Sequence, residues 1–291
     1  MKPLRKFFDT HKPKFTSGGS LEKYFPIYDV FENLFYSSDK RTFGSVHIRD
    51  SIDLQKVMVV VWMATFPAMF YGMYNLGYHS LAAFEELGAI NKDDWHFIFI
   101  DLLCNYDPKS IWDCIWFGAC YFIPIYLVTF IVGIAWEVIF AIVRGHEINE
   151  GAFVTTVLFA LCCPPDAPLW QVALGISFGI VVAKEIFGGT GKNFLNPALA
   201  GRAFLYFAYP VDWSGDSVWV AVDGYSSPTI LGIGAQEGLN GIQAQYSWSD
   251  AFFGSIPGSI GETSTLFILL GLAILLYTRV ASWRIIAGVL L

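Results

Sequence analysis

The sequence predicts an all-α integral membrane protein, a bundle of several transmembrane helices of which some are broken or re-entrant. Hydrophobic residues make up 55% of its 291 residues and charged residues only 15%, against roughly 45–50% and 25% in soluble domains. Long uncharged runs and shorter apolar segments interrupted by Gly and Pro follow one another along the chain. The basic N-terminus is followed by no apolar core with a small-residue cleavage site, so we expect no cleavable signal peptide.

Long uncharged runs predict the membrane spans. Residues 57–84 contain no Asp, Glu, Lys or Arg, and residues 114–143 contain only Glu137. Both runs exceed the ~20 residues that cross a bilayer, and the second is long enough to tilt or to project from it. Residues 263–278 lie near the lower limit of length and predict a third span.

Three shorter apolar segments lie between these spans. Residues 152–163 and 169–183 are short, and residues 194–209 carry Arg202 in their middle. Short segments punctuated by Gly and Pro are typical of broken helices that meet near the membrane midplane. Non-helical backbone at that depth must line a cavity or be buried in protein, which indicates a ligand site.

The distribution of positive charge predicts the orientation. Ten of the 18 Lys and Arg lie in residues 1–56, so this stretch is expected to be cytoplasmic. Following the spans, Lys184, Lys192 and Arg202 are expected to cluster on the cytoplasmic side, and residues 210–263 to form an external, periplasmic loop.

We therefore divide the chain into a cytoplasmic N-terminal extension, residues 1–53, and a transmembrane domain, residues 54–291. The net charge of −7 reflects acidic outer loops and indicates no nucleic-acid partner.

The five cysteines predict no metal or iron–sulfur site within this chain alone. They show no C-x-x-C spacing and no histidine at ligand spacing. Small apolar residues in or near helices are the favoured interpretation, although the adjacent Cys162 and Cys163 could contribute ligands to a site shared with another subunit.

A glycine-rich turn at residues 188–192 leads to Asn193 and Asn196. It lacks a phosphate-binding P-loop pattern, because Ile186 stands where the first Gly is needed and Asn193 replaces the Ser or Thr. The two amides suit the polar edge of a neutral heterocycle such as an isoalloxazine or a quinone. Helix capping by either Asn is the alternative.

Glu137 is an acid inside a span, which is by default a hypothesis about ion or proton handling. It lies about two helical turns before Arg144. The alternative is that it snorkels to the cytoplasmic interface.

Thr229 ends a turn-rich segment, residues 223–229, that follows an Asp-Gly pair. The tetrapeptide Ser-Ser-Pro-Thr at residues 226–229 differs at two positions from the Ser-Gly-Ala-Thr pattern that carries FMN in two families of membrane redox pumps. Gly, Ser, Pro and Asp are also ordinary turn residues, which is the alternative interpretation.

Four motifs occur in the same order as in a known family. Residues 144–151, 183–202, 223–229 and 256–264 closely resemble the B-type subunit of the bacterial sodium-translocating NADH:quinone oxidoreductase, and the match covers essentially the whole chain. The D-type subunit of the Rnf ferredoxin:NAD oxidoreductase shares the flavin motif but generally lacks the long basic extension. Residues 1–50 therefore favour the first family.

The resemblance implies roles for five residues. Thr229 matches the threonine that carries covalent FMN as a phosphoester, attached by a separate flavin transferase. Asn193 and Asn196 match positions near a non-covalent riboflavin. Glu137 matches an intramembrane acid tied to sodium uptake, and Gly133 lies in the region linked to quinone. No catalytic residue and no metal ligand is assigned.

The resemblance also implies a fold and an assembly. The family fold has about ten helices in two related halves, similar to urea and ammonium transporters, and we expect this chain to be a partial sequence holding the first half. The implied protein is a lipid-embedded subunit of a hetero-oligomer in the bacterial inner membrane, which relays electrons through flavins to ubiquinone while Na+ crosses. The alternatives are the D-type subunit of an Rnf-type complex and a non-redox solute channel.

Overall fold

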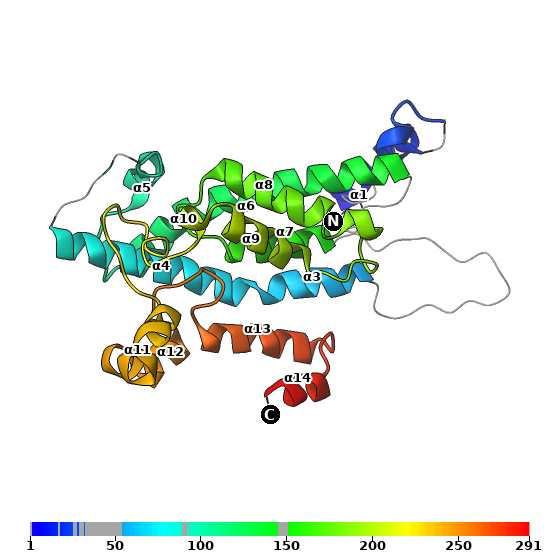
Figure 1. The fold of residues 1–291 in the computed structure, drawn as a ribbon. Helices are drawn as coiled ribbons and strands as arrows, with labels where there is room; N and C mark the ends of the chain where they lie inside the picture. Colours follow the sequence, from blue (N-terminus) through cyan, green and yellow to red (C-terminus); the bar gives the residue numbers. More distant parts are fainter. Residues whose placement is uncertain are drawn as a thin grey trace.

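All regular secondary structure in the described residues is helical, which confirms the predicted fold class (Figure 1). The computed structural model describes residues 2–16, 18–25, 28, 32, 54–88, 92, 94–144 and 151–290.

Three helical stretches of the described chain are long and apolar enough to cross a membrane: residues 56–87, 111–144 and 169–187. The first consists of α3 (Leu54–Ala64) and α4 (Phe66–Leu87), the second is α6 (Ile111–Arg144), and the third consists of α8 (Leu169–Val181) and the 3-10 turn η2 (Glu185–Phe187). The first two spans match the uncharged runs of the sequence.

The prediction of a third span at residues 263–278 was wrong in length. Helix α13 (Thr265–Tyr277) has only 13 residues, because the Ser264 side chain caps its start and Arg279 takes a positive φ of 60° just after its end. Residues 169–183 were conversely expected to be too short. The η2 turn extends α8 to Phe187, so the stretch reaches 19 residues.

The first span is interrupted at Thr65. Its hydroxyl donates a hydrogen bond to the carbonyl of Trp62 at 2.7 Å, and Pro67 occupies the first turn of α4. Proline is well tolerated in a first turn, where its missing N–H has no helical partner to lose. The sequence therefore divides a single apolar run into two helices.

Helix α6 lies at the centre of the bundle and packs on α4, α8 and α7 (Gly151–Leu161). Two glycines allow α4 and α6 to approach closely. A Cβ on Gly77 would lie 1.9 Å from the carbonyl oxygen of Cys114, and one on Gly118 would lie 1.9 Å from that of Met73. Such small-residue contacts are how membrane helices gain packing energy without a hydrophobic effect between them.

Helix α9 (Pro197–Ala208) packs on α8 and α7, and α13 packs on α3 and α4 on another side of the bundle (Figure 1). Residues 210–263 were expected to be an external loop, but they hold further helices: α10 (Pro210–Trp213), α11 (Ile230–Gln245) and α12 (Trp248–Phe253). Gly238 kinks α11 with a φ of 68°.

The remaining helices lie at the periphery. Helix α5 (Phe97–Leu103) packs on α6, and α14 (Trp283–Leu290) follows α13. In the N-terminal extension, α1 (Lys2–Phe15) contacts η1 (Glu22–Tyr24).

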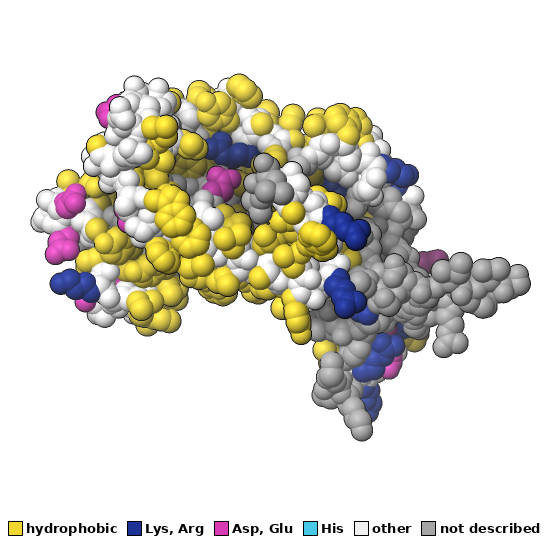
Figure 2. All heavy atoms as spheres, turned by 90° about the horizontal axis from the view of Figure 1, so that it is seen from below, with side chains coloured by type: hydrophobic (Ala, Val, Ile, Leu, Met, Phe, Trp, Pro, Cys, Tyr) yellow, Lys and Arg dark blue, Asp and Glu magenta, His cyan; other side chains and the backbone are white. Residues whose placement is uncertain are grey.

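The outer surface of the bundle is apolar. Figure 2 shows hydrophobic side chains covering most of one face, with charged side chains gathered mostly towards its two ends. Large side chains such as Ile131, Val143 and Phe207 are well exposed on the described helices. A continuous apolar surface of this kind is expected to contact lipid or other membrane subunits.

Candidate functional site

Thr229 begins helix α11. Its side-chain oxygen accepts a hydrogen bond of 3.1 Å from the backbone N–H of Gly232, so it is the N-cap of the helix. The residue is half-buried, and Pro228 before it is half-buried too. The predicted flavin position therefore lies at the positive end of a helix dipole, where a phosphate group is electrostatically favoured.

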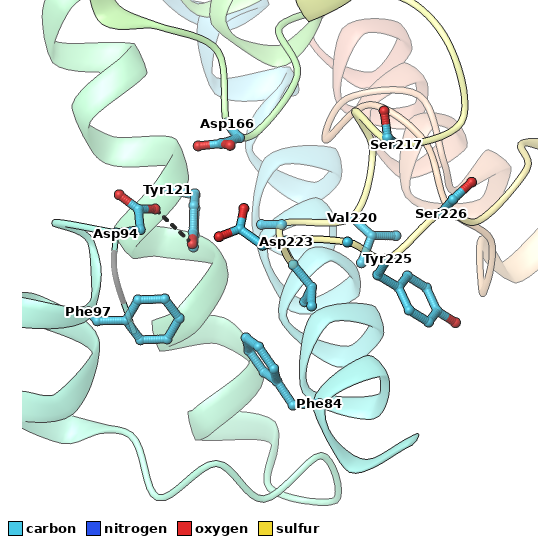
Figure 3. A pocket seen from close by; sticks show the side chains of 13 residues that line it. Phe84, Asp94, Phe97, Tyr121, Asp166, Ser217, Val220, Asp223, Tyr225 and Ser226 are labelled. Atoms are coloured by element: carbon cyan, nitrogen blue, oxygen red, sulfur yellow. Dashed lines mark hydrogen bonds between the residues drawn. The ribbon is translucent and has the colours of Figure 1, made fainter. Parts of the chain in front are cut away.

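A cavity of about 380 Å³ lies beside this turn, and Asp223, Tyr225 and Ser226 are among the residues that line it (Figure 3). Thr229 itself does not line the cavity. The opposite wall comes from Phe84 of α4 and from two further aromatic residues.

Phe97 and Tyr121 complete the aromatic wall of this cavity, and three carboxylates face it. Asp94, Asp166 and Asp223 come from three separate parts of the chain, and Figure 3 shows them around the Tyr121 ring. The Tyr121 hydroxyl donates to Asp94 at 3.1 Å. Among the described residues that line the cavity there is no Lys or Arg, so its wall is acidic.

His96 joins two of these acids in a cluster that the sequence did not predict. Its Nδ1 lies 2.5 Å from Asp94 Oδ2, and ligand-type atoms of Asp94, His96 and Asp166 all lie within 4.8 Å of one another, a group that could hold a metal ion. The prediction of no metal site rested on cysteine spacing, whereas the folded chain brings Asp166 to this pair from a distant loop. No single sequence window contains the set.

The cluster also perturbs proton binding. Partial burial, followed by the neighbouring carboxylates Asp94, Asp223 and Asp212, raises the pKa of Asp166 to about 6. Burial lowers the pKa of His96, although the hydrogen bond with Asp94 opposes this effect. Both shifts disfavour the charged form, because burial is the largest cause of each and takes the charged group partly out of water.

Asn193 and Asn196 shape the turn between η2 and α9. Asn196 is the N-cap of α9 and accepts hydrogen bonds from the backbone N–H groups of Ala198 (3.0 Å) and Leu199 (3.4 Å). The Asn193 amide accepts from Gly191 and donates to Leu195. The capping alternative therefore holds for Asn196.

These contacts leave few polar groups of the turn available to hydrogen-bond a flavin. Within the described chain, the side-chain nitrogen of Asn196 has no hydrogen-bond partner, and the buried hydroxyl of Thr190 has none either. Asn193 already uses both ends of its amide inside the turn. The side-chain NH2 of Asn196 and the hydroxyl of Thr190 thus remain for a polar ring edge, and they fit such a group.

Glu137 is buried inside the bundle. Its side chain is 3% exposed, as is that of Lys184, and the Lys184 ammonium donates a hydrogen bond to its carboxylate. The snorkelling alternative is therefore wrong, because the side chain is held by a cation from the end of α8 and does not reach the surface. The sequence contained the acid but did not indicate its partner, which lies 47 positions away.

A second ion pair lies beside the first. Arg144 Nη1 lies 3.2 Å from Glu185 Oε2, and Arg144 Nη2 donates to the Glu185 carbonyl at 2.8 Å. Glu185 is buried, and Arg144 is about one-third exposed. The last two turns of α6 and the residues after α8 thus carry two acids and two bases in matched pairs.

Gly133 is a packing contact between helices. A Cβ there would lie 2.7 Å from Thr156 Cγ2 and 3.2 Å from Ile180 Cδ1. The glycine therefore lets α6 meet α7 and α8 one turn from Glu137. Its assignment to a quinone region stays a prediction.

Arg202 does not join Lys184 and Lys192, contrary to the predicted cluster. Its Nε donates to the Cys162 carbonyl at 3.1 Å, and its Nη2 donates to the Trp213 carbonyl at 2.8 Å. Trp213 in turn hydrogen-bonds to the start of α8, whereas Lys184 follows its end. Because α9 runs back along α8, Arg202 points to the opposite end of the bundle, where it satisfies one carbonyl just after α7 and one at the end of α10.

Cys162 and Cys163 are free thiols, and Cys163 is buried with its thiol donating to the Phe159 carbonyl. This arrangement matches the favoured interpretation of cysteine as a small residue near helices.

Comparison with known proteins places the chain in a family. Residues 41–291 match the model of the NQR2, RnfD, RnfE family. A protein of Chromohalobacter salexigens, named as the B-type subunit of the Na(+)-translocating NADH-quinone reductase, is 57% identical over 288 residues, which is 98% of this chain and 70% of the relative. The proteins of the same name from Pseudomonas paraeruginosa and Azotobacter vinelandii are 54% and 55% identical, and each match covers 99% of this chain and 72% of the relative. The extent of the family match and this level of identity over nearly the whole chain mean that the chain belongs to the NQR2, RnfD, RnfE family.

Proposed function

We propose that this chain is a membrane subunit of a sodium-translocating NADH:quinone oxidoreductase, and that it relays electrons through covalent FMN and riboflavin to ubiquinone while Na+ crosses the membrane. The observation that carries this proposal is the 54–57% identity, over nearly the whole chain, to relatives named as the B-type subunit of that reductase. A bundle with several membrane-length helices and an apolar outer surface supports the location in a membrane.

Covalent FMN is proposed at Thr229. A phosphoester at this hydroxyl would place a charged phosphate at the N-terminus of α11, where the backbone N–H of Gly232 already points. The adjacent cavity contains Phe84, Phe97 and Tyr121 as apolar contacts. When bound, the flavin would supply the redox chemistry, and the chain would hold its phosphate and exclude water from its surroundings.

Replacing Thr229 by Val tests this assignment, because valine keeps the shape of threonine without the hydroxyl. In-gel flavin fluorescence of the denatured chain should disappear in Thr229→Val. Ser226 and Ser227 provide matched controls in the same turn, and Ser226→Ala and Ser227→Ala should remain fluorescent. A fluorescent band in Thr229→Val would contradict the assignment, and an unlabelled native chain would favour a non-redox solute channel.

Riboflavin is proposed at the turn between η2 and α9, held by the free amide donor of Asn196 and the orphaned hydroxyl of Thr190, with Asn193 fixing the turn. Losing a hydrogen-bond partner costs about 1–3 kcal/mol. Asn196→Asp is the sharper variant, because it keeps the capping oxygen and removes the donor. We expect it to lose extractable riboflavin while retaining covalent FMN, and unchanged riboflavin would reduce Asn196 to a helix cap.

The ion and quinone steps are assigned to the interior of the bundle. We propose that Glu137 lies on the Na+ path, because a buried carboxylate is the appropriate ligand for a hard cation, and that the quinone binds in the region of Gly133. The partners would be the other subunits of the complex, a flavin transferase and membrane lipid. The location is the bacterial inner membrane, with the N-terminal extension cytoplasmic and the Thr229 turn periplasmic.

A further inference from the structure

The buried pair of Glu137 and Lys184 raises a question of charge balance. Each side chain is 3% exposed, and each comes from a different membrane-length stretch. Taking a single charged group out of water costs several kcal/mol, which an opposite charge in direct contact offsets. The pair is therefore neutral as a unit, and the Glu137 carboxylate already has a cation at hydrogen-bonding distance.

Binding of a second cation at the Glu137 carboxylate would disturb this charge balance. Na+ placed beside Glu137 while Lys184 keeps its ammonium in contact would leave a net positive charge in a low-dielectric interior. The neighbouring acid does not remove this excess, because Glu185 is itself matched by Arg144 at 3.2 Å. The two pairs together contain as many bases as acids.

We propose that Lys184 is the resident counter-cation of Glu137, and that Na+ binds there by displacing the lysine ammonium. This inference rests on the proposed function, in which Glu137 lies on the Na+ path. Lys184 then sets the apparent Na+ affinity, because the carboxylate is available only in the fraction of molecules whose lysine has moved away.

The local structure allows the lysine to move. Lys184 lies between α8 and the single 3-10 turn η2, with φ −121° and ψ −63°, outside helical geometry. The η2 turn ends at Gly188, and Gly188 and Gly189 take φ values of 110° and 89°, so no long helix continues beyond the lysine. Lysine is also a compact charge on a flexible stem. Its ammonium can therefore leave Glu137 without unwinding α6.

The test compares two replacements of Lys184 in the assembled, purified complex. We measure the Na+ concentration that gives half-maximal NADH:quinone reductase activity. Lys184→Met should lower it by about tenfold, within the usual range of coupling between two ligands, because the competing charge is gone. Lys184→Arg should raise it by a similar factor, because a guanidinium stays charged and holds a carboxylate with two hydrogen bonds.

Two controls make the result specific. Lys192→Met removes an exposed positive charge from the same segment and should leave the half-maximal Na+ concentration unchanged. Glu137→Gln should raise that concentration, and adding Lys184→Met to it should have no further effect. If the Lys184→Met complex fails to assemble, the half-maximal Na+ concentration of Lys184→Arg decides the test, since this variant preserves the charge pair.

The outcomes separate this inference from the proposed function. If Glu137→Gln raises the half-maximal Na+ concentration while both Lys184 variants keep the parent value, Lys184 has only a structural role and the inference is overturned. If Glu137→Gln itself has no effect on Na+ dependence, Glu137 is not on the ion path, and both the assignment and the inference that rests on it fail.

Discussion

The two ends of the bundle differ in how their acidic side chains are surrounded. At one end, Glu137 and Glu185 are buried and each contacts a base, Lys184 and Arg144 respectively; we call these four residues the paired cluster. At the other end, the carboxylates of Asp94, Asp166 and Asp223 surround one cavity; we call these three residues the acidic cluster.

The difference follows from access to water. The side chains of Glu137 and Lys184 are each 3% exposed, so their charges must be matched inside the protein. Asp166 and Asp223 have exposed surface, so water screens much of their mutual repulsion. The partial burial of Asp166, followed by the repulsion that remains, raises its pKa. The acids buried between helices are thus each in contact with a Lys or Arg, whereas no Lys or Arg is among the described residues that line the cavity.

The largest expected effect is at the paired cluster. Lys184→Met removes the ammonium that contacts the buried Glu137 carboxylate, and breaking a buried pair in this way costs about 3–5 kcal/mol. Thermal unfolding of the purified complex in sodium-free buffer should show a large drop in stability. The double variant with Glu137→Gln should recover most of the loss, and a single variant as stable as the parent would contradict the comparison.

A smaller effect is expected from Arg144→Lys. Arg144 donates both to the Glu185 carboxylate and to its backbone carbonyl, and an ammonium cannot reproduce this planar arrangement. Loss of one of these contacts at a partly exposed site should cost about 1 kcal/mol. The same thermal unfolding assay measures it, with Lys192→Arg as a control that changes an exposed base in the segment after α8. Equal stability of Arg144→Lys and the parent would mean that the second contact contributes nothing.

The smallest effect is expected at the acidic cluster, and it depends on pH. Because the pKa of Asp166 is raised to about 6 from an ordinary value of 3.8, the folded protein holds this proton more tightly than the unfolded chain. Stability from the protonated form is present below pH ~4 and is lost as the pH rises through about 6.

Asp166→Asn should remove the loss of stability that ionisation of Asp166 causes as the pH rises. The variant should be more stable than the parent above pH ~6, by less than about 1 kcal/mol because water screens an exposed carboxylate, and the difference should vanish towards pH ~4. Unfolding temperatures measured across this pH range provide the test. A variant that is less stable than the parent in mildly alkaline buffer would indicate that the Asp166 charge has a stabilising partner.

The sequence predicted the helices better than the contacts between them. Uncharged runs identified the α3–α4 stretch and α6, because membrane-length apolar runs are strongly constrained. The extent of α8 was missed, because the η2 turn lengthens it beyond the apolar run and hydropathy does not report 3-10 turns. The inferred position of Arg202 was wrong, because counting spans assigns a side to a segment but not a direction to a long side chain.

The candidate sites, too, were predicted as single residues and not as contacts between distant residues. Glu137 and Thr229 could be selected as candidates because an acid inside a span and a hydroxyl after an Asp-Gly turn are local signals. The partner of Glu137 was not found, since Lys184 is distant in sequence and meets it only through the packing of α6 against α8. His96 was missed for a similar reason, because its cluster with Asp166 forms only when the loop before α8 reaches the segment before α5.

The central claim of this account is that the Glu137 carboxylate needs one cation, supplied either by Lys184 or by Na+. Thermal unfolding of the Lys184→Met complex in sodium chloride and in choline chloride, at equal ionic strength, tests it most directly. We predict that Na+ raises the unfolding temperature of Lys184→Met well above its value in choline, and does so much less for the parent, where the lysine already occupies the carboxylate. Equal unfolding temperatures of the variant in the two salts would contradict the claim.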